Sequence, residues 1–95
     1  MDIINTTSHV YELEGSMGKL RKKLVHHKGE FYMVSENTVL EETLVFRASP
    51  TGDVDCYSEV GGGKGLTVEQ VVADFDNQLY KSGYWGYDDD ETEDL

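Results

Sequence analysis

The chain has 95 residues with 19 acidic and 8 basic side chains, which gives a formal net charge of −11. This length excludes two independently folded cores, so one small domain is expected. The charge argues against a free-standing nucleic-acid-binding protein, because that affinity depends on neutralising phosphates. It also argues against docking on anionic membranes.

Cysteine use and hydropathy favour a cytoplasmic protein. Cys56 is the single cysteine, so no internal disulfide can form, as is usual in a reducing compartment. The first residues have neither the basic start nor the apolar run of a signal peptide. No stretch approaches the roughly 18 apolar residues of a membrane span, so we expect no contact with a membrane.

Strand patterns dominate the first two thirds of the chain. Residues 1–8 are polar and without periodicity, and we expect a loose N-terminal arm or a lead-in to a strand over residues 9–13. Residues 15–18 are expected to form a turn or a short connection. Lys28-Gly29 and the Ser49–Asp53 segment are typical of tight turns. Four strands are predicted around these turns, over residues 20–27, 30–36, 43–47 and 54–60.

The clearest helical pattern begins at Thr67. Thr67 and Gln70 have the spacing of a capping box, in which each side chain binds the other residue's backbone amide. Apolar residues follow at helical spacing: Val68, Val71, Val72, Phe75 and Leu79. The helix is expected to end near Lys81, with Gly83 as the left-handed terminating residue. The predicted fold class is therefore α+β, a four-stranded antiparallel meander with one C-terminal helix packed on one face.

No residue pattern indicates catalysis or metal binding. His26 and His27 are neighbours in a predicted strand, so their side chains point to opposite faces and cannot chelate together. Nothing beside Cys56 is expected to lower its pKa. The glycine-rich segment 61–65 is predicted to be a flexible connector, and anion binding there is a weaker alternative because the P-loop spacing is missing. We expect no enzyme, no metal and no cofactor.

The C-terminal residues combine aromatic and acidic side chains. Residues 88–95 hold six acids in eight positions and are predicted to be a disordered acidic tail behind a domain of residues 1–87. Tyr and Trp side chains often dominate protein–protein contacts, and carboxylates can imitate spaced phosphates. The predicted partner-binding residues are Tyr84, Trp85, Tyr87, Asp88, Asp89, Asp90 and Glu91, extended on the helix by Glu69, Asp74 and Asp76.

A basic stretch opposes this acidic character. Residues 19–28 contain no acid and hold five of the eight basic side chains: Lys19, Arg21, Lys22, Lys23 and Lys28. Weak nucleic-acid contact through this predicted strand pair is one interpretation. Pairing of this stretch with the acidic tail, within one molecule or across a dimer, is another.

Residues 42–76 also carry a resemblance. The segment Glu42–Phe46, the turn Gly52-Asp53-Val54, the segment Tyr57–Val60 and a Thr-Val-Glu helix start resemble small bacteriophage-encoded accessory proteins with a Glu-Thr-x-Val-Phe hairpin. The resemblance implies a phage origin and a compact sheet-plus-helix fold, and it transfers no catalytic residue. Small acidic phage proteins often bind host or defence proteins, so it also implies a partner of that kind in the cytoplasm of an infected bacterium.

These observations lead to one functional hypothesis and two alternatives. The first is a non-enzymatic inhibitor that binds a host nucleic-acid-handling or defence protein through its acidic surface, as a DNA mimic or an anti-CRISPR-like inhibitor would. The second is a self-associating assembly module, with a homodimer formed through the open sheet or Trp85. The third is weak nucleic-acid contact through residues 19–28, which the net charge disfavours.

Overall fold

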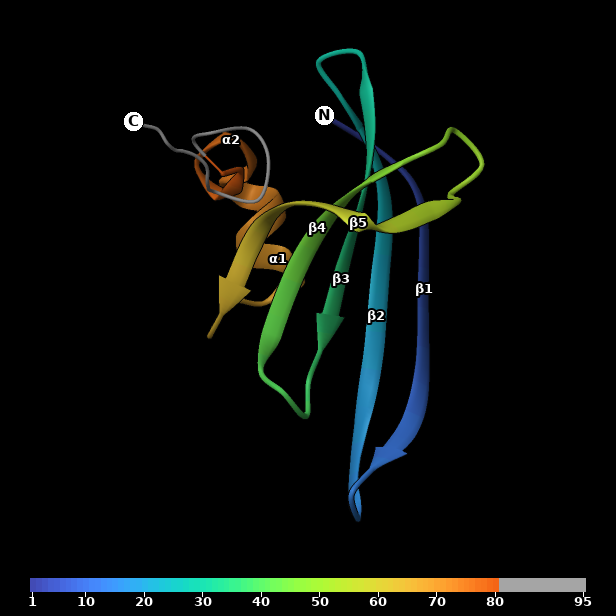
Figure 1. Ribbon diagram of the computed structural model, residues 1–95, viewed down its shortest axis with the longest axis vertical. Coiled ribbons are helices and arrows are strands. Elements are labelled where there is room, and N and C mark those ends of the chain that lie inside the picture. The colour runs from blue at the N-terminus through green and yellow to red at the C-terminus, as the bar shows by residue number, and fades with distance from the viewer. Residues whose placement is uncertain (81–95) are drawn as a thin grey trace.

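The computed structural model describes residues 1–80 and shows one antiparallel sheet with two short helices against one face (Figure 1). The strands lie side by side in chain order. The elements are β1 Asp2–Leu13, β2 Ser16–His27, β3 Glu30–Asn37, β4 Glu42–Ala48, β5 Val54–Lys64, α1 Val68–Ala73 and α2 Phe75–Gln78. The predicted antiparallel meander is confirmed. The predicted count of four strands and the single helix are wrong.

Strand β1 replaces the predicted loose arm. It pairs with β2 from Asp2, opposite His26, to Leu13, opposite Ser16. Isoleucine, threonine and valine are frequent in this segment, and β-branched side chains favour extended backbone. The turn to β2 is Glu14-Gly15, with φ of 51° and 84°, which is the pair of positive angles that a two-residue hairpin requires.

The predicted turns between the central strands are confirmed. Lys28 and Gly29 both have positive φ, at 51° and 83°, and they connect β2 to β3 as a second two-residue hairpin. In the β4–β5 loop the amide of Gly52 donates to the carbonyl of Ser49 at 2.9 Å. Gly52 has φ of 92°, the left-handed conformation expected for it.

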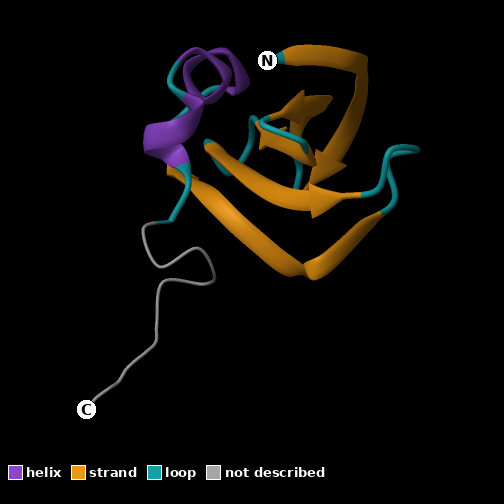
Figure 2. Ribbon diagram, turned by 90° about the horizontal axis from the view of Figure 1, so that it is seen from above, coloured by secondary structure: helices purple, strands orange, loops and turns teal. Residues whose placement is uncertain are grey.

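The glycine-rich segment is strand rather than connector. β5 continues through Gly61, Gly62 and Gly63 to Lys64, and the register with β4 shifts between Val45 and Phe46. Figure 2 shows the sharp bend of β5, and a bulge of this kind bends a strand. The glycines are needed because other backbone lies close. A Cβ on Gly61 would stand 2.3 Å from the carbonyl oxygen of Gln78.

The predicted helix begins where expected and ends early. Both capping-box hydrogen bonds are present, from the Gln70 amide to Thr67 Oγ1 at 3.1 Å and from the Thr67 amide to Gln70 Oε1 at 2.8 Å. Asp74 then leaves the helical conformation, with φ of −135° and ψ of 44°. Its carboxylate accepts a hydrogen bond from the Asn77 side chain at 2.8 Å, and such local bonding competes with a continuous helix.

After α2 the chain returns to the sheet instead of remaining helical. Leu79 forms an antiparallel bridge with Gly61, and the amide of Tyr80 donates to the carbonyl of Val60 at 2.8 Å. The expected helix end at Lys81 and Gly83 is therefore wrong, because Leu79 is already extended. This return covers part of the outer edge of β5.

The core lies between the sheet and the two helices. Its buried side chains are Val25, Tyr32, Val34, Val45, Val60, Val68, Val71 and Phe75. The ring of Phe75 meets Tyr32 edge-on, with centroids 5.1 Å apart, a favoured aromatic geometry. α1 packs mainly on β2 and β3 and α2 mainly on β5, while β1 is exposed along nearly its whole length.

We predict that Gly61→Ala destabilises the fold by about 2 kcal/mol, the range of a substitution that forces backbone apart. The new Cβ would lie 2.3 Å from the Gln78 carbonyl oxygen and 3.0 Å from Leu79 Cα. Urea denaturation followed by circular dichroism measures the change. Gly63→Ala is the matched control, because its Cβ would meet only Leu66 Cδ1 at 3.8 Å. Equal losses in the two variants would contradict the close-approach argument.

Candidate interaction surface

The predicted basic residues lie on β2 and its turn but do not form one patch. Successive strand residues point to opposite faces, so Lys19, Arg21 and Lys23 share the helix-bearing face and Lys22 lies on the opposite, open face. Lys28 lies in the turn to β3. The basic stretch is therefore divided between the two faces of the sheet and the β2–β3 turn.

Arg21 ties α1 to the sheet through two carboxylates. Its Nη1 donates to Glu36 Oε1 at 2.9 Å, and its guanidinium also forms a two-pronged pair with Glu69 on α1. The hydrogen bond from Arg21 holds the pKa of Glu69 below its usual range, and the same bond raises the pKa of Arg21. Bidentate pairs of this kind are the stronger class of ion pair.

Glu36 is the buried member of this cluster. It is only 6% exposed, and its Oε1 also accepts from the amide of Val68 at 3.4 Å. That amide is one of the unpaired donors at the start of α1. A buried carboxylate needs such partners, because desolvation of an unpaired charge is costly.

A second ion-pair cluster joins α2 to the β2–β3 turn. Asp76 Oδ1 lies 2.9 Å from His27 Nε2, and Asp76 Oδ2 accepts from Lys28 Nζ at 3.1 Å. The hydrogen bonds from His27 and then from Lys28 lower the pKa of Asp76. Asp74, the third helix carboxylate predicted to bind a partner, is bonded to Asn77.

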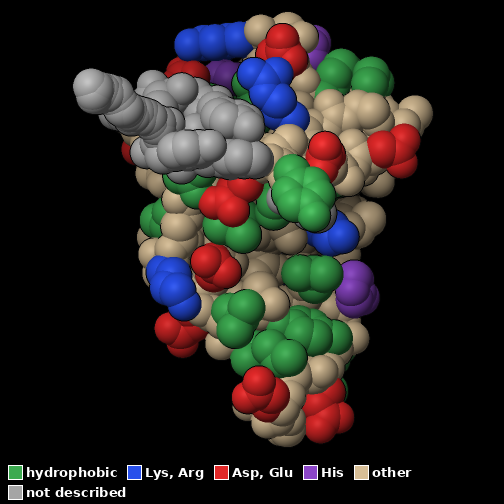
Figure 3. All heavy atoms as spheres, viewed as in Figure 1, with side chains coloured by type: hydrophobic (Ala, Val, Ile, Leu, Met, Phe, Trp, Pro, Cys, Tyr) green, Lys and Arg blue, Asp and Glu red, His purple; other side chains and the backbone are tan. Residues whose placement is uncertain are grey.

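The structure thus brings the predicted acidic surface of the helix into contact with the predicted basic stretch. Glu69 and Asp76 were expected to extend an acidic partner-binding surface, and they pair instead with Arg21, His27 and Lys28. Acidic and basic side chains are interspersed on the face that Figure 3 shows. The other predicted partner-binding residues, namely Tyr84, Trp85, Tyr87, Asp88, Asp89, Asp90 and Glu91, lie outside the described residues.

Three of the five predicted basic residues form no ion pair within residues 1–80: Lys19, Lys22 and Lys23. The charge of Lys23 contributes to the lowered pKa of Glu69, after the larger effect of Arg21. Lys23 Nζ donates to Thr6 Oγ1 at 3.3 Å. Its ammonium group therefore already reaches across to β1, the outermost strand on this side of the sheet.

The outer edge of β1 has no strand partner among residues 1–80. The amide of Lys19 donates to Thr38 Oγ1 and its carbonyl accepts from the Thr38 amide, so Lys19 directs its backbone groups away from β1. In an antiparallel pair, residues whose backbone groups bond to the partner strand alternate with residues whose backbone groups point away from it. Arg21 and Lys23 therefore point away from β1 as Lys19 does. The residues opposite these three direct their own amides and carbonyls outward, away from β2. These residues are Val10, Ser8 and Thr6.

One hydrogen bond agrees with this assignment. The amide of Thr6 donates to the side-chain oxygen of Asn5 at 2.9 Å, as an outward amide without a strand partner can. Large apolar side chains are also exposed along β1, with Ile3 and Ile4 each 51% exposed and Val10 60% exposed.

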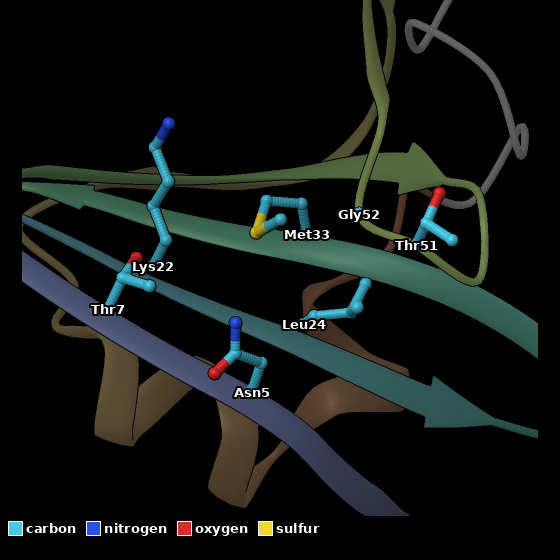
Figure 4. A pocket seen from close by; sticks show the side chains of 7 residues that line it. All are labelled: Asn5, Thr7, Lys22, Leu24, Met33, Thr51 and Gly52. Atoms are coloured by element: carbon cyan, nitrogen blue, oxygen red, sulfur yellow. The ribbon is translucent and has the colours of Figure 1, made fainter.

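A hollow of about 180 Å³ adjoins this edge on the open face. Figure 4 shows its lining from three neighbouring strands and the β4–β5 loop. Polar groups come from Lys22, from Asn5 and Thr7 on β1, and from Thr51 in the loop. The apolar lining is Leu24 and Met33, with Gly52 beside them.

Other kinds of site find no support in the described part of the chain. Residues 1–80 contain no group of three or more His, Cys, Asp or Glu side chains that could hold a metal ion. Their helices are too short to cross a membrane.

Sequence reasoning missed both the open edge and the buried carboxylate. The β-branched content of residues 3–10 is a sign of strand that was available. The burial of Glu36 had no sign in the sequence, because its partners Arg21 and Val68 come from other elements.

Comparisons with known protein families, with curated proteins and with solved structures found no match. The resemblance to phage accessory proteins therefore stays a prediction.

We predict that Glu69→Gln lowers stability by less than about 1 kcal/mol at neutral pH, since exposed pairs contribute modestly. The folded-state pKa of Glu69 is lowered, so its pair with Arg21 stabilises the fold above the unfolded-state pKa of the carboxyl group. That contribution is lost as pH falls through the lowered folded-state pKa. Thermal melts of wild type and variant should therefore converge in acid.

Glu12→Gln is the control for this measurement, because Glu12 is exposed and forms no ion pair within the described residues. A difference between wild type and Glu69→Gln that persists unchanged at low pH would contradict the electrostatic origin of the effect.

Proposed function

We propose that this chain is a non-enzymatic interaction protein that binds an extended segment of a partner protein along the outer edge of β1. The observation that carries the proposal is an edge strand of 12 residues whose outward backbone groups have no strand partner within residues 1–80. Addition of a strand to such an edge is a common mode of peptide recognition.

The composition of β1 supports this interpretation. Edge strands are usually protected by proline, by lysine, by shortness or by a covering segment. The segment Asp2–Leu13 contains no proline and no lysine, and its only irregularity is a register shift between Ile3 and Asn5. The edge over Asn5–Leu13 is thus long, regular and free of proline and lysine, and Glu12 is the one acidic residue in it.

The partner is better supplied by another protein than by a second copy of this chain. Asp2 and Glu12 are the charged residues of β1, and the strand has no Lys or Arg. No register of β1 against itself places opposite charges across the new interface, and like charges opposite one another are unfavourable. Self-association through β1 is therefore an alternative restricted to registers that keep Asp2 and Glu12 apart.

A second candidate function keeps the acidic C-terminal segment as the binding surface. Six acids within residues 88–95, next to Tyr84, Trp85 and Tyr87, support an inhibitor of a host nucleic-acid-handling or defence protein of the kind that the phage resemblance implies. The pairing of Glu69 with Arg21 and of Asp76 with Lys28 leaves this candidate dependent on the C-terminal segment alone.

The edge proposal predicts that Ser8→Pro abolishes partner binding while the fold is retained. Proline removes the outward amide of Ser8, which serves no strand pair within residues 1–80, and proline is tolerated at strand edges. Amide hydrogen exchange on the complex should show protection at Thr6, Ser8 and Val10 in the wild type. Ser8→Ala is the matched control, because it keeps the amide and should bind as the wild type does.

Val10→Lys provides a second variant at an exposed position, since a lysine on an edge disfavours strand addition. Binding that is unchanged in both Ser8→Pro and Val10→Lys, with circular dichroism like that of the wild type, would sink the edge proposal.

The second candidate function predicts that binding depends on residues 88–95 and not on the edge of β1. Removing residues 88–95 should reduce capture of a host protein at least tenfold, because six of the acids leave with them. Quantitative pull-down with full-length and truncated chains makes the comparison, and Ser8→Pro should then have no effect. Equal capture by the two chains would exclude the acidic segment as the binding surface.

A further inference from the structure

We infer that the segment bound along β1 is acidic, and that Lys19, Lys22 and Lys23 of β2 hold its carboxylates from both faces of the sheet. This inference rests on the proposed function and names the chemistry of the partner. The three lysines are the members of the predicted basic stretch that form no ion pair within residues 1–80.

The lysines lie within reach of an added strand. Neighbouring strands are about 4.8 Å apart, so an added strand would lie one spacing beyond β1 and two beyond β2. Lys23 Nζ already lies 3.3 Å from Thr6 Oγ1 on β1. The ammonium group of Lys23 thus already extends from β2 to β1. A carboxylate on the added strand beside Thr6 would lie close to it.

The two faces offer different surroundings to the side chains of the segment. On the helix-bearing face, Lys19 and Lys23 lie opposite Val10 and Thr6, so the site there combines the exposed Lys19 beside an apolar side chain with the half-buried Lys23 beside a hydroxyl. On the open face, Lys22 lies opposite Thr7 and borders the hollow. Since strand side chains alternate between faces, acidic residues on either face find a lysine.

The hollow suits a glutamate side chain. The methylene groups would contact Leu24 and Met33, and the carboxylate would lie at the end of the hollow that Lys22, Asn5 and Thr7 line (Figure 4). Thr51 lies at the other end and donates its hydroxyl to Asp53 Oδ2 at 3.0 Å. A cavity of about 150 Å³ accommodates benzene, and the hollow measures about 180 Å³. Combined apolar contact and charge pairing is typical of the side-chain pockets that give strand addition its specificity.

The net charge of −11 does not exclude an acidic partner. Exposed charges are screened over about 8 Å at physiological ionic strength, so the field at that edge comes from the charges of β1 and β2 themselves, in which Lys19, Lys22 and Lys23 outnumber Asp2 and Glu12. Glu69 and Asp76, the helix carboxylates on the same side, are paired with Arg21 and with His27 and Lys28.

An acidic peptide fits this edge better than a nucleic acid does. The outward amides and carbonyls of Thr6, Ser8 and Val10 form a ladder that another peptide backbone can pair. A phosphodiester backbone cannot supply the matching donors. Three lysines within an acidic chain also give a small electrostatic contribution to nucleic-acid affinity.

Synthetic peptides test the inference on the full chain. The probe is a fluorescein-labelled peptide of about eight residues, the length of an ordinary strand, in which pairs of Glu alternate with pairs of Val, so that both faces of the strand carry carboxylates. Its control replaces each Glu with Gln. Fluorescence anisotropy should show the acidic peptide binding at least tenfold more tightly than the neutral one, with a difference that shrinks as salt is added.

Substitution of the lysines locates the binding. Lys22→Gln and the double variant Lys19→Gln/Lys23→Gln should each weaken the acidic peptide about fivefold to tenfold, as expected when a charge-assisted contact is lost. Lys64→Gln is the matched control. Lys64 lies on β5, opposite Glu42, and like the other three it forms no ion pair within residues 1–80, so its loss should change affinity less than twofold.

The outcomes separate this inference from the proposed function. If the Gln peptide binds as tightly as the acidic one, Ser8→Pro abolishes both and the lysine variants change nothing, the edge function stands and the acidic partner is excluded. If acidic binding needs the lysines but survives Ser8→Pro, strand addition itself is excluded.

Two further results would reassign the site. Tighter, lysine-dependent binding of a single-stranded oligonucleotide would replace the peptide with a nucleic acid. More than tenfold tighter peptide binding by a chain lacking residues 88–95 would identify the chain's own acidic segment as the occupant instead of a partner's.

Discussion

The buried carboxylate of Glu36 is the constraint on which the packing of α1 depends. It is 6% exposed and is bound by Arg21 from β2 and by the first amide of α1 at Val68. A buried charge without partners would be strongly destabilising. The helix begins where the amide of Val68 meets Glu36, and the capping box at Thr67 sets its start at the same place.

This arrangement decides which charges remain for a partner. Arg21 is held between Glu36 and Glu69, and Lys28 pairs with Asp76. What the sequence presents as an acidic helix face opposite a basic strand is, in the folded chain, a set of contacts that holds the helices on the sheet. Within residues 1–80, three of the four basic residues without an ion pair lie on β2 beside β1, namely Lys19, Lys22 and Lys23, and the fourth, Lys64, lies on β5.

Local features of the fold could be predicted from the sequence, and features that join distant elements could not. The capping box, the Lys28-Gly29 hairpin and the Ser49–Asp53 turn each depend on residues within one turn of chain. The ion pair between Arg21 and Glu69 joins residues 48 positions apart. Nothing in either segment indicates that they meet, so the helix carboxylates were assigned to a partner.

Strand β1 and the glycine-rich part of β5 escaped prediction for two different reasons. β1 is exposed along nearly its whole length, so it lacks the alternation of buried and exposed residues on which strand prediction depends. Gly61 and Gly62 have the composition of a loop, and their role becomes evident only when the neighbouring backbone is known. A Cβ on Gly62 would lie 2.1 Å from the carbonyl oxygen of Thr43.

The two edges of the sheet, at β1 and at β5, differ in their cover, because the chain covers part of the β5 edge with its own residues. Leu79 and Tyr80 return to β5 and pair with Gly61 and Val60, which removes donors and acceptors from that edge. This cover requires a glycine at position 61, because a side chain there would strike the returning backbone. At β1 no residue of the described chain plays the same part, and only the side chain of Asn5 satisfies an outward amide. Because unpaired strand edges favour association, the uncovered edge is the position at which this fold can still gain backbone hydrogen bonds, and the lysines behind it determine which segments gain them.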